Sequence, residues 1–252
     1  MKKIIYTILS IATLTACKKE ATTCINNPNI NYSSIGTPVG KFGDCIKDID
    51  GNSYKTVTIG TQTWMGENLK VSKYNDGTAI SNLTDNTQWQ NNTTGAWSYY
   101  NNDVANNAKY GKLYNWYAVS KTSNGNKNVC PTGWHVPTNA EWAVLTYYLG
   151  NNHLDDTVAG GKMKEVGTTS WESPNTDATN TSLFAALPGG RRFGYFDNYK
   201  NNGGFWWSSS EVDTSDPYPF GAWGLLISYN NGGAFIGEMV KSNGLSVRCL
   251  KD

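Results

Sequence analysis

Residue types that could catalyse a reaction are scarce in this chain, which has two histidines and five cysteines. His135 lies in the string GWHVPT, directly before a helix start, and we expect a packed turn residue there. His153 follows two asparagines and is expected to be exposed. The chain has no third histidine and no Cys-x-x-Cys pair, so it offers no dedicated zinc site. No Gly-x-Ser-x-Gly elbow supports a serine nucleophile, and Gly160-Gly161-Lys162 lacks the spacing of a phosphate-binding loop.

Aromatic residues gather in the segment that follows Gly189-Gly190, and they are the chief binding candidates. The segment holds Tyr195, Phe196, Tyr199, Trp206, Trp207, Tyr218, Phe220 and Trp223. Such rings can stack on the apolar faces of sugars or pack against a protein partner. In Phe205-Trp206-Trp207 neighbouring side chains point to opposite faces of a strand, so one tryptophan is expected to be buried. Our candidates for contact with a glycan or a protein partner are Tyr195, Tyr199, Trp206, Trp207, Tyr218 and Trp223.

Three acidic residues, Glu211, Asp213 and Asp216, follow the string WWSSS. Calcium takes oxygen ligands of this kind, so these residues are the candidate metal ligands. Loop acids are more commonly solvated than coordinated, so we expect no cofactor. The alternative is a calcium ion bound by these three residues.

The N-terminus predicts lipid anchoring. Lys2-Lys3 and a short apolar stretch make residues 1–16 a signal peptide that is too short to span a membrane. Leu14-Thr15-Ala16-Cys17 resembles the lipobox of bacterial lipoproteins, which implies cleavage before Cys17 and its acylation on sulfur and amine. Two or three acyl chains anchor a protein stably. We expect a lipid-anchored protein of the bacterial outer membrane that faces the periplasm or the cell surface.

Cysteine usage fits an oxidising compartment. Lipidation of Cys17 leaves Cys24, Cys45, Cys130 and Cys249, an even number with three possible pairings. The residues alone do not choose among these pairings.

Composition and charge narrow the fold and the partners. The chain has 10 Trp, 15 Tyr and 26 Gly, with few aliphatic residues, which favours a loop-rich β or α+β domain. Its formal net charge is +1 and it has no basic run, so we expect no nucleic-acid partner.

One helix can be predicted in detail, over residues 139–149. Thr138 and Glu141 have the spacing of a capping box, and Trp142 begins an apolar face that continues through Leu145 and Leu149. Gly150 is expected to end the helix in a left-handed conformation. A second, short helix is expected within residues 111–120, packed beside the first.

The other segments are expected to be strands and loops. Residues 17–44 are predicted to be a polar tether, followed by a β-meander over 46–65 and a long ordered loop region over 72–110 whose aromatic residues are buried. The C-terminal third is expected to be β, with a hairpin that joins 223–229 to 234–240. A last strand over 245–250 should lie near the meander, so that the chain ends meet.

Six strings occur together and in order, and they carry a resemblance. They are DIDGNSYKTVTIGTQTWMGENL (48–69), GKLYNWYAV (111–119), CPTGWHVPTNAEW (130–142), ATNTSLFAALPGGRR (178–192), WWSSSE (206–211) and SVRCL (246–250). The set resembles the Fibrobacter succinogenes major paralogous domain of Bacteroidetes and Fibrobacteres lipoproteins, and it covers about residues 45–252. The family usually has Ala where Gly66 stands and Gly-Phe where Leu183-Phe184 stands.

The resemblance implies a C-type-lectin-like fold of the α+β class. Such a fold has two main helices, a twisted antiparallel sheet, a long irregular loop region and terminal strands that lie together. A disulfide between the first helix region and the last strand is common, which implies Cys130–Cys249 and leaves Cys24–Cys45. The EPN, QPD and WND strings of calcium-binding lectins are absent.

The resemblance does not confer an activity, because fold groups host many functions. We expect a non-enzymatic binding domain. One alternative is an oxidoreductase like the formylglycine-generating enzymes of the same fold group, which would need a redox-active cysteine pair in a cleft. Another is a purely structural protein of the cell envelope.

Overall fold

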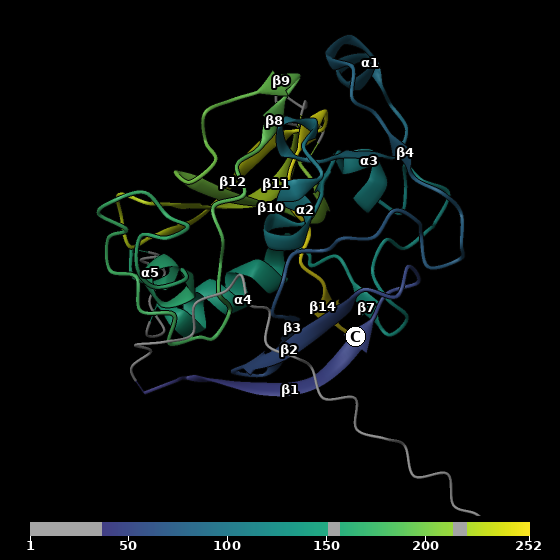
Figure 1. Cartoon of the computed structure of the whole chain (residues 1–252). Helices are drawn as coiled ribbons and strands as arrows, with labels where there is room; N and C mark the ends of the chain where they lie inside the picture. Colours follow the sequence, from purple (N-terminus) through teal and green to yellow (C-terminus); the bar gives the residue numbers. More distant parts are fainter. Residues whose placement is uncertain (1–36, 151–156, 214–220) are drawn as a thin grey trace, which may run out of the picture.

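The computed structural model describes residues 37–150, 157–213 and 221–252 of the chain (Figure 1). They form a mixed α/β domain in which several small, mainly antiparallel sheets are joined by short helices and long connections. Among these residues no helix is long and apolar enough to cross a membrane.

The predicted meander forms the base of the domain (Figure 1). Its strands are β1 (Gly40–Lys47), β2 (Ser53–Ile59) and β3 (Gln62–Met65). The last strand, β14 (Leu250–Lys251), joins β3 through Leu250 and Trp64, and its other side pairs with β7 (Trp134–His135). The N-terminal meander and the last strand therefore lie in one sheet, as predicted.

The expected start of the domain at residue 45 was wrong. Strand β1 begins at Gly40, and Gly40 and Phe42 lie opposite Ile59 and Val57 of β2. The register shifts between Phe42 and Cys45, so the glycine-rich segment is a bulged edge strand rather than part of a tether.

A second sheet stands above the base and contains the predicted C-terminal hairpin. Its strands are β10 (Gly203–Glu211), β11 (Gly221–Ser228) and β12 (Ala234–Val240), in that order across the sheet. The pairing of β11 with β12 is regular from Gly221 opposite Val240 to Ile227 opposite Ala234. The sheet thus presents a fixed alternation of side chains to its two faces.

The remaining elements are short. The small strands are β4 (Ser81–Asn82), β5 (Ala96–Ser98), β6 (Leu113–Tyr114), β8 (Arg192–Phe193), β9 (Tyr195–Phe196) and β13 (Asn243–Gly244). The short helices are α1 (Asn86–Asn91), η1 (Tyr100–Asn102), α2 (Ala105–Tyr110), α3 (Trp116–Val119) and α5 (Ala159–Met163). The region 72–110 is irregular but packed, because Trp89, Trp97 and Tyr100 are buried as expected.

Helix α4 (Asn139–Leu149) has the predicted bounds and the predicted capping box at Thr138 and Glu141. It lies between the two sheets in Figure 1, and Trp142 stacks on Trp64 of the base at 4.6 Å between ring centroids. The left-handed conformation expected at Gly150 was wrong. Gly150 has φ of −76° and its N–H donates to Thr146 O at 2.7 Å, as in a continuing helical turn.

The helix predicted within 111–120 is shorter than expected. Leu113 and Tyr114 pair with β5 instead, and Asn115 caps the single turn of α3 by accepting from the N–H of Ala118. The predicted last strand is also interrupted: Leu245 and Ser246 make isolated bridges before Leu250 resumes regular pairing.

Two large hydrophobic clusters of the core lie on opposite faces of β10, and a third, small cluster consists of Tyr110, Ala185 and Leu187. Trp206 belongs to the cluster beneath α4, and Trp207 belongs to the cluster that includes the disulfide. Their indole N–H groups donate to Asn68 Oδ1 at 2.8 Å and to Tyr114 O at 2.6 Å. A core this rich in tryptophan is stable because each buried polar end has a partner.

The disulfide Cys130–Cys249 is present, with Cα atoms 5.9 Å apart, and it confirms the pairing that the resemblance implied. It joins the segment before α4 to the segment before β14, and both cysteines are fully buried. Cys45 is also a disulfide cysteine. Its predicted partner, Cys24, lies outside the described residues.

Candidate ligand-binding surface

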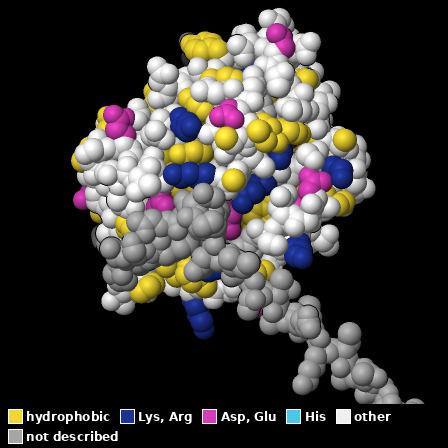
Figure 2. All heavy atoms as spheres, in the orientation of Figure 1, with side chains coloured by type: hydrophobic (Ala, Val, Ile, Leu, Met, Phe, Trp, Pro, Cys, Tyr) yellow, Lys and Arg dark blue, Asp and Glu magenta, His cyan; other side chains and the backbone are white. Residues whose placement is uncertain are grey.

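The hairpin of β8 and β9 lies at the end of the domain opposite the base (Figure 1), and it carries exposed aromatic side chains. Gly194 turns the hairpin with φ of 69°, a conformation that glycine adopts without strain. Phe193 and Tyr195 lie opposite each other in register and are 45% and 62% exposed. Figure 2 shows hydrophobic side chains at this tip.

An arginine connects this hairpin to the segment before β10. The guanidinium of Arg191 lies 5.8 Å from the ring centroid of Phe193, 4.8 Å from Tyr199 and 5.0 Å from Phe205. Its Nε donates to Asp197 Oδ2 at 2.7 Å, which fixes the side chain in this position. Stacking of a cation on several rings holds them in place. Phe193 and Tyr199 stay exposed, whereas Phe205 is buried. Tyr199 is 44% exposed.

The second sheet extends this surface. Phe205, Leu226 and Phe235 lie opposite one another on β10, β11 and β12, so their side chains share one face of the sheet. Phe205 is buried under Tyr199, whereas Phe235 is 39% exposed. We call the exposed residues Phe193, Tyr195, Tyr199 and Phe235, together with Arg191, the aromatic surface.

A buried arginine holds the hairpin in place. Arg192 donates from Nη1 to Leu83 O at 2.6 Å and from Nη2 to Thr84 O at 3.1 Å, and it lies 4.4 Å from the ring centroid of Trp89. Burial lowers the pKa of Arg192 to about 10, and the charge of Asp85 opposes that effect. The hairpin is therefore tied to the start of α1 rather than being a free loop.

Two of the predicted contact residues cannot reach a ligand. Trp206 and Trp207 are both fully buried, although burial was expected for only one of them, because both faces of β10 are covered by core clusters. Trp223 is half-buried and pairs with Glu238, on the sheet face opposite Phe205 and Phe235. The prediction that Trp206, Trp207 and Trp223 lie together on one ligand-binding surface was therefore wrong.

The other predicted residues have different outcomes. Tyr195 and Tyr199 are exposed on the aromatic surface, whereas Tyr218 lies outside the described residues. Sequence reasoning missed Phe193, Phe235 and Arg191. Two sequence features could have indicated the two phenylalanines. Side chains alternate between the two faces of β12, which contains Phe235, and Phe193 lies beside the turn glycine Gly194.

The predicted metal ligands are only partly described. The carboxylate of Glu211 forms an ion pair with Lys241, and Asp213 ends a described segment. Asp216 lies outside the described residues. Over residues 37–150, 157–213 and 221–252 no group of three His, Cys, Asp or Glu side chains could hold a metal ion.

His135 lies between two carboxylates. Its Nδ1 is 2.6 Å from Asp252 Oδ1, and its Nε2 is 3.0 Å from Glu141 Oε1. Burial would raise the pKa of Glu141, but hydrogen bonds from Thr138 and His135 outweigh it and lower the pKa. His135 thus stabilises the start of α4, as expected of a packed turn residue, and His153 lies outside the described residues.

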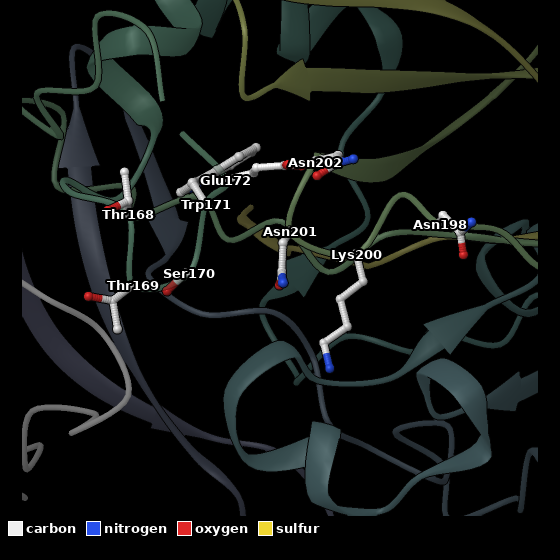
Figure 3. Close-up of a pocket in the computed structure, with 9 residues that line it drawn as sticks. All are labelled: Thr168, Thr169, Ser170, Trp171, Glu172, Asn198, Lys200, Asn201 and Asn202. Carbon is white, nitrogen blue, oxygen red and sulfur yellow. The ribbon is translucent and has the colours of Figure 1, made fainter. Parts of the chain in front are cut away.

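A polar pocket of about 410 Å³ lies between two loops (Figure 3). One wall is the segment 168–172, and the other is the segment 198–202, which leads into β10. Figure 3 shows Thr168, Thr169 and Ser170 on one side and Lys200 and Asn201 across from them. We call this space the polar pocket.

Comparisons with known proteins identify related sequences but no related structure. A family model described as the Fibrobacter succinogenes major domain matches residues 57–251. A second model, the prokaryotic membrane lipoprotein lipid attachment site, matches residues 1–17. No match is found among curated proteins or solved structures.

Proposed function

Because this chain belongs to the Fibrobacter succinogenes major domain family and carries a lipoprotein attachment site, we propose that it is a membrane-anchored binding protein. In this proposal a non-enzymatic domain recognises a glycan or a protein partner through the aromatic surface. Its membrane is the bacterial outer membrane, on the periplasmic or the cell-surface side. The anchor at Cys17 supplies attachment, and the domain supplies recognition.

The observation that carries the proposal is the exposure of ordered aromatic rings. Phe193, Tyr195 and Tyr199 keep 44% or more of their surface in water although Arg191 and Arg192 hold their backbone and rings firmly. A protein gains nothing in stability from such exposure, whereas a partner that covers these rings gains both buried area and stacking. Rings held in advance also lose little entropy on binding.

The placement of the surface supports the same function. The first described residues, which follow the anchor, lie at the base of the domain, whereas the β8–β9 hairpin lies at the far end (Figure 1). A domain that is tethered through its N-terminus would therefore present the aromatic surface away from the membrane.

A C-type-lectin-like arrangement is part of this proposal. Two features support it: β14 pairs with β3 of the N-terminal meander, and Cys130–Cys249 ties the α4 region to the end of the chain. The burial of this cysteine pair supports a structural role over an oxidoreductase role. Calcium at Glu211, Asp213 and Asp216 stays a prediction.

The proposal can be tested with the full-length protein in detergent micelles on a glycan array and on immobilised envelope proteins. Replacing Tyr195 or Tyr199 by Ala should lower binding by about tenfold or more, since each removes a ring from an interface. Tyr147→Ala is the matched control, because Tyr147 is 45% exposed on α4, away from the hairpin.

Equal binding by the wild type, Tyr195→Ala and Tyr199→Ala to a specific ligand would overturn the assignment of the aromatic surface. Absence of any specific ligand would favour a purely structural envelope protein. Titration of free thiols in the mature protein addresses the oxidoreductase alternative, which requires a reducible, accessible cysteine pair.

A further inference from the structure

We propose that the polar pocket is a hydrogen-bonding subsite for one saccharide unit of a neutral glycan. This inference rests on the proposed binding function and names its ligand class. The pocket volume of about 410 Å³ falls within the range of about 300–1,000 Å³ that is usual for small-molecule sites. Its lining is dominated by hydroxyl and amide groups, which match a polyhydroxylated ligand.

One backbone hydrogen bond joins the two walls, because the N–H of Glu172 donates to Asn201 O at 2.9 Å. The second wall is also held to the preceding turn, since the N–H of Asn201 donates to Pro188 O at 3.0 Å. Trp171, a buried residue of the lining, donates from Nε1 to Ala186 O at 2.9 Å. The pocket is therefore formed before a ligand arrives, which limits the entropy lost on binding.

Several side chains of the lining have unused hydrogen-bonding groups. Among the described residues, no partner is found for the hydroxyls of Thr168 and Thr169, the carboxylate of Glu172 or the amides of Asn198 and Asn202. A sugar hydroxyl both donates and accepts, so hydroxyl, amide and carboxylate groups around one space suit it.

Two further side chains are fixed by the protein but keep spare donors. Lys200 donates from Nζ to Asn106 Oδ1 at 2.9 Å, and Asn201 accepts from Tyr110 at 3.3 Å through Oδ1. Two N–H groups of Lys200 and the Nδ2 group of Asn201 remain to donate to a ligand. Lys200 carries a positive charge and Glu172 a negative charge, so the lining has no net charge. Such a lining favours a neutral ligand.

The pocket and the aromatic surface are joined by one segment. Asn198, Lys200 and Asn201 line the pocket, whereas Tyr199 between them in the sequence packs on Phe205. In the proposal, a glycan chain that places one unit in the pocket contacts the Tyr199 ring with another unit. The pocket would then supply hydrogen bonds, and the aromatic surface would supply stacking.

The test uses the full-length protein in detergent micelles and an array of neutral oligosaccharides, followed by titration calorimetry with the strongest hit. Glu172→Gln replaces one of the two charged acceptor oxygens by an NH2 group, and Thr169→Val removes a hydroxyl, so each should weaken binding by about tenfold. Both side chains are exposed and lack protein partners, so folding should be unchanged. Glu238→Gln, at an exposed position on β12, is the matched control.

The outcomes separate the two proposals. Weaker binding by the pocket variants with unchanged binding by Glu238→Gln supports the subsite. Binding that is lost in Tyr199→Ala but unchanged in Glu172→Gln and Thr169→Val overturns the subsite and leaves the aromatic surface standing. Failure of every neutral oligosaccharide to bind also overturns the subsite, while specific capture of an envelope protein through Tyr195 would retain the proposed function.

Discussion

Two neighbouring arginines have different roles in the proposed site. Arg191 is partly exposed and lies against the rings of Phe193 and Tyr199, so it shapes the surface that a ligand would meet. Arg192 is fully buried and donates only to groups of the protein. The sequence string GGRR does not distinguish these roles, because they depend on the tertiary partners of each side chain, Asp197 for Arg191 and the carbonyl of Leu83 for Arg192.

Arg192→Lys should destabilise the domain by about 2–3 kcal/mol, because lysine cannot replace the forked donation to Leu83 O and Thr84 O. Arg191→Lys should cost about 1 kcal/mol or less, since its ion pair with Asp197 is partly solvated. Urea unfolding of both variants measures the difference. Equal midpoints would show that Arg192 does not hold the hairpin.

Gly160 marks a close approach of two backbones that no sequence pattern predicted. A Cβ at this position would lie 1.8 Å from the carbonyl oxygen of Gly233. Gly160→Ala should therefore cost about 3 kcal/mol or more, as the α5 segment must move away from the turn before β12. At Gly237 a Cβ would meet nothing within 4 Å, so Gly237→Ala should stay within about 0.5 kcal/mol of the wild type by thermal unfolding.

At the scale of elements, α4 was predictable because its signals are local. The signals lie within a few residues of one another: the capping box of Thr138 and Glu141, and the spacing of the apolar residues Trp142 and Leu145. The β8–β9 hairpin was not predicted, because it is only two residues long on each side and its position depends on Arg192 contacts with residues 83–85. The burial of both Trp206 and Trp207 likewise depends on what covers the second face of β10.

The cap of α4 should give the protein a specific acid dependence. The pKa of Glu141 is lowered in the folded state, so its stabilising effect is present above the unfolded value and is lost as the pH falls through the folded value. Glu141→Gln should lower the free energy of unfolding at neutral pH and flatten its decline below about pH 4.5. Urea unfolding from pH 3 to 7, with Glu238→Gln as the control, checks this, and parallel curves for wild type and E141Q would contradict it.

At the scale of the whole molecule, resemblance predicted more than local pattern did. The six ordered strings implied the Cys130–Cys249 pairing, which is present. They also implied that the last strand lies beside the N-terminal meander, which the strand pattern had predicted as well and which the structure contains. The binding surface was predicted only in part, through Tyr195 and Tyr199. Phe235 belongs to the surface because β12 pairs with β11, and Phe193 belongs to it because Arg191 lies over its ring. Both are tertiary contacts that the local sequence does not indicate.

The disulfide should be the strongest single stabilising link of the fold. Cys130 and Cys249 are 119 residues apart in sequence, so their bond restricts a long loop of the unfolded chain. The double variant C130A/C249A should lose about 4–5 kcal/mol on the chain-entropy model. Thermal unfolding of the oxidised wild type and the variant measures this, and a change in Tm of only a degree or two would contradict it.

In the proposed function the partner binds the aromatic surface. Hydrogen exchange of the full-length protein in lipid nanodiscs, with and without the strongest ligand from the arrays, tests it most directly. We predict slower exchange in residues 192–203 and 234–240 and no change in residues 139–149. Protection confined to α4 or the base sheet, with unchanged exchange in the β8–β9 hairpin, would show that the partner does not bind the aromatic surface.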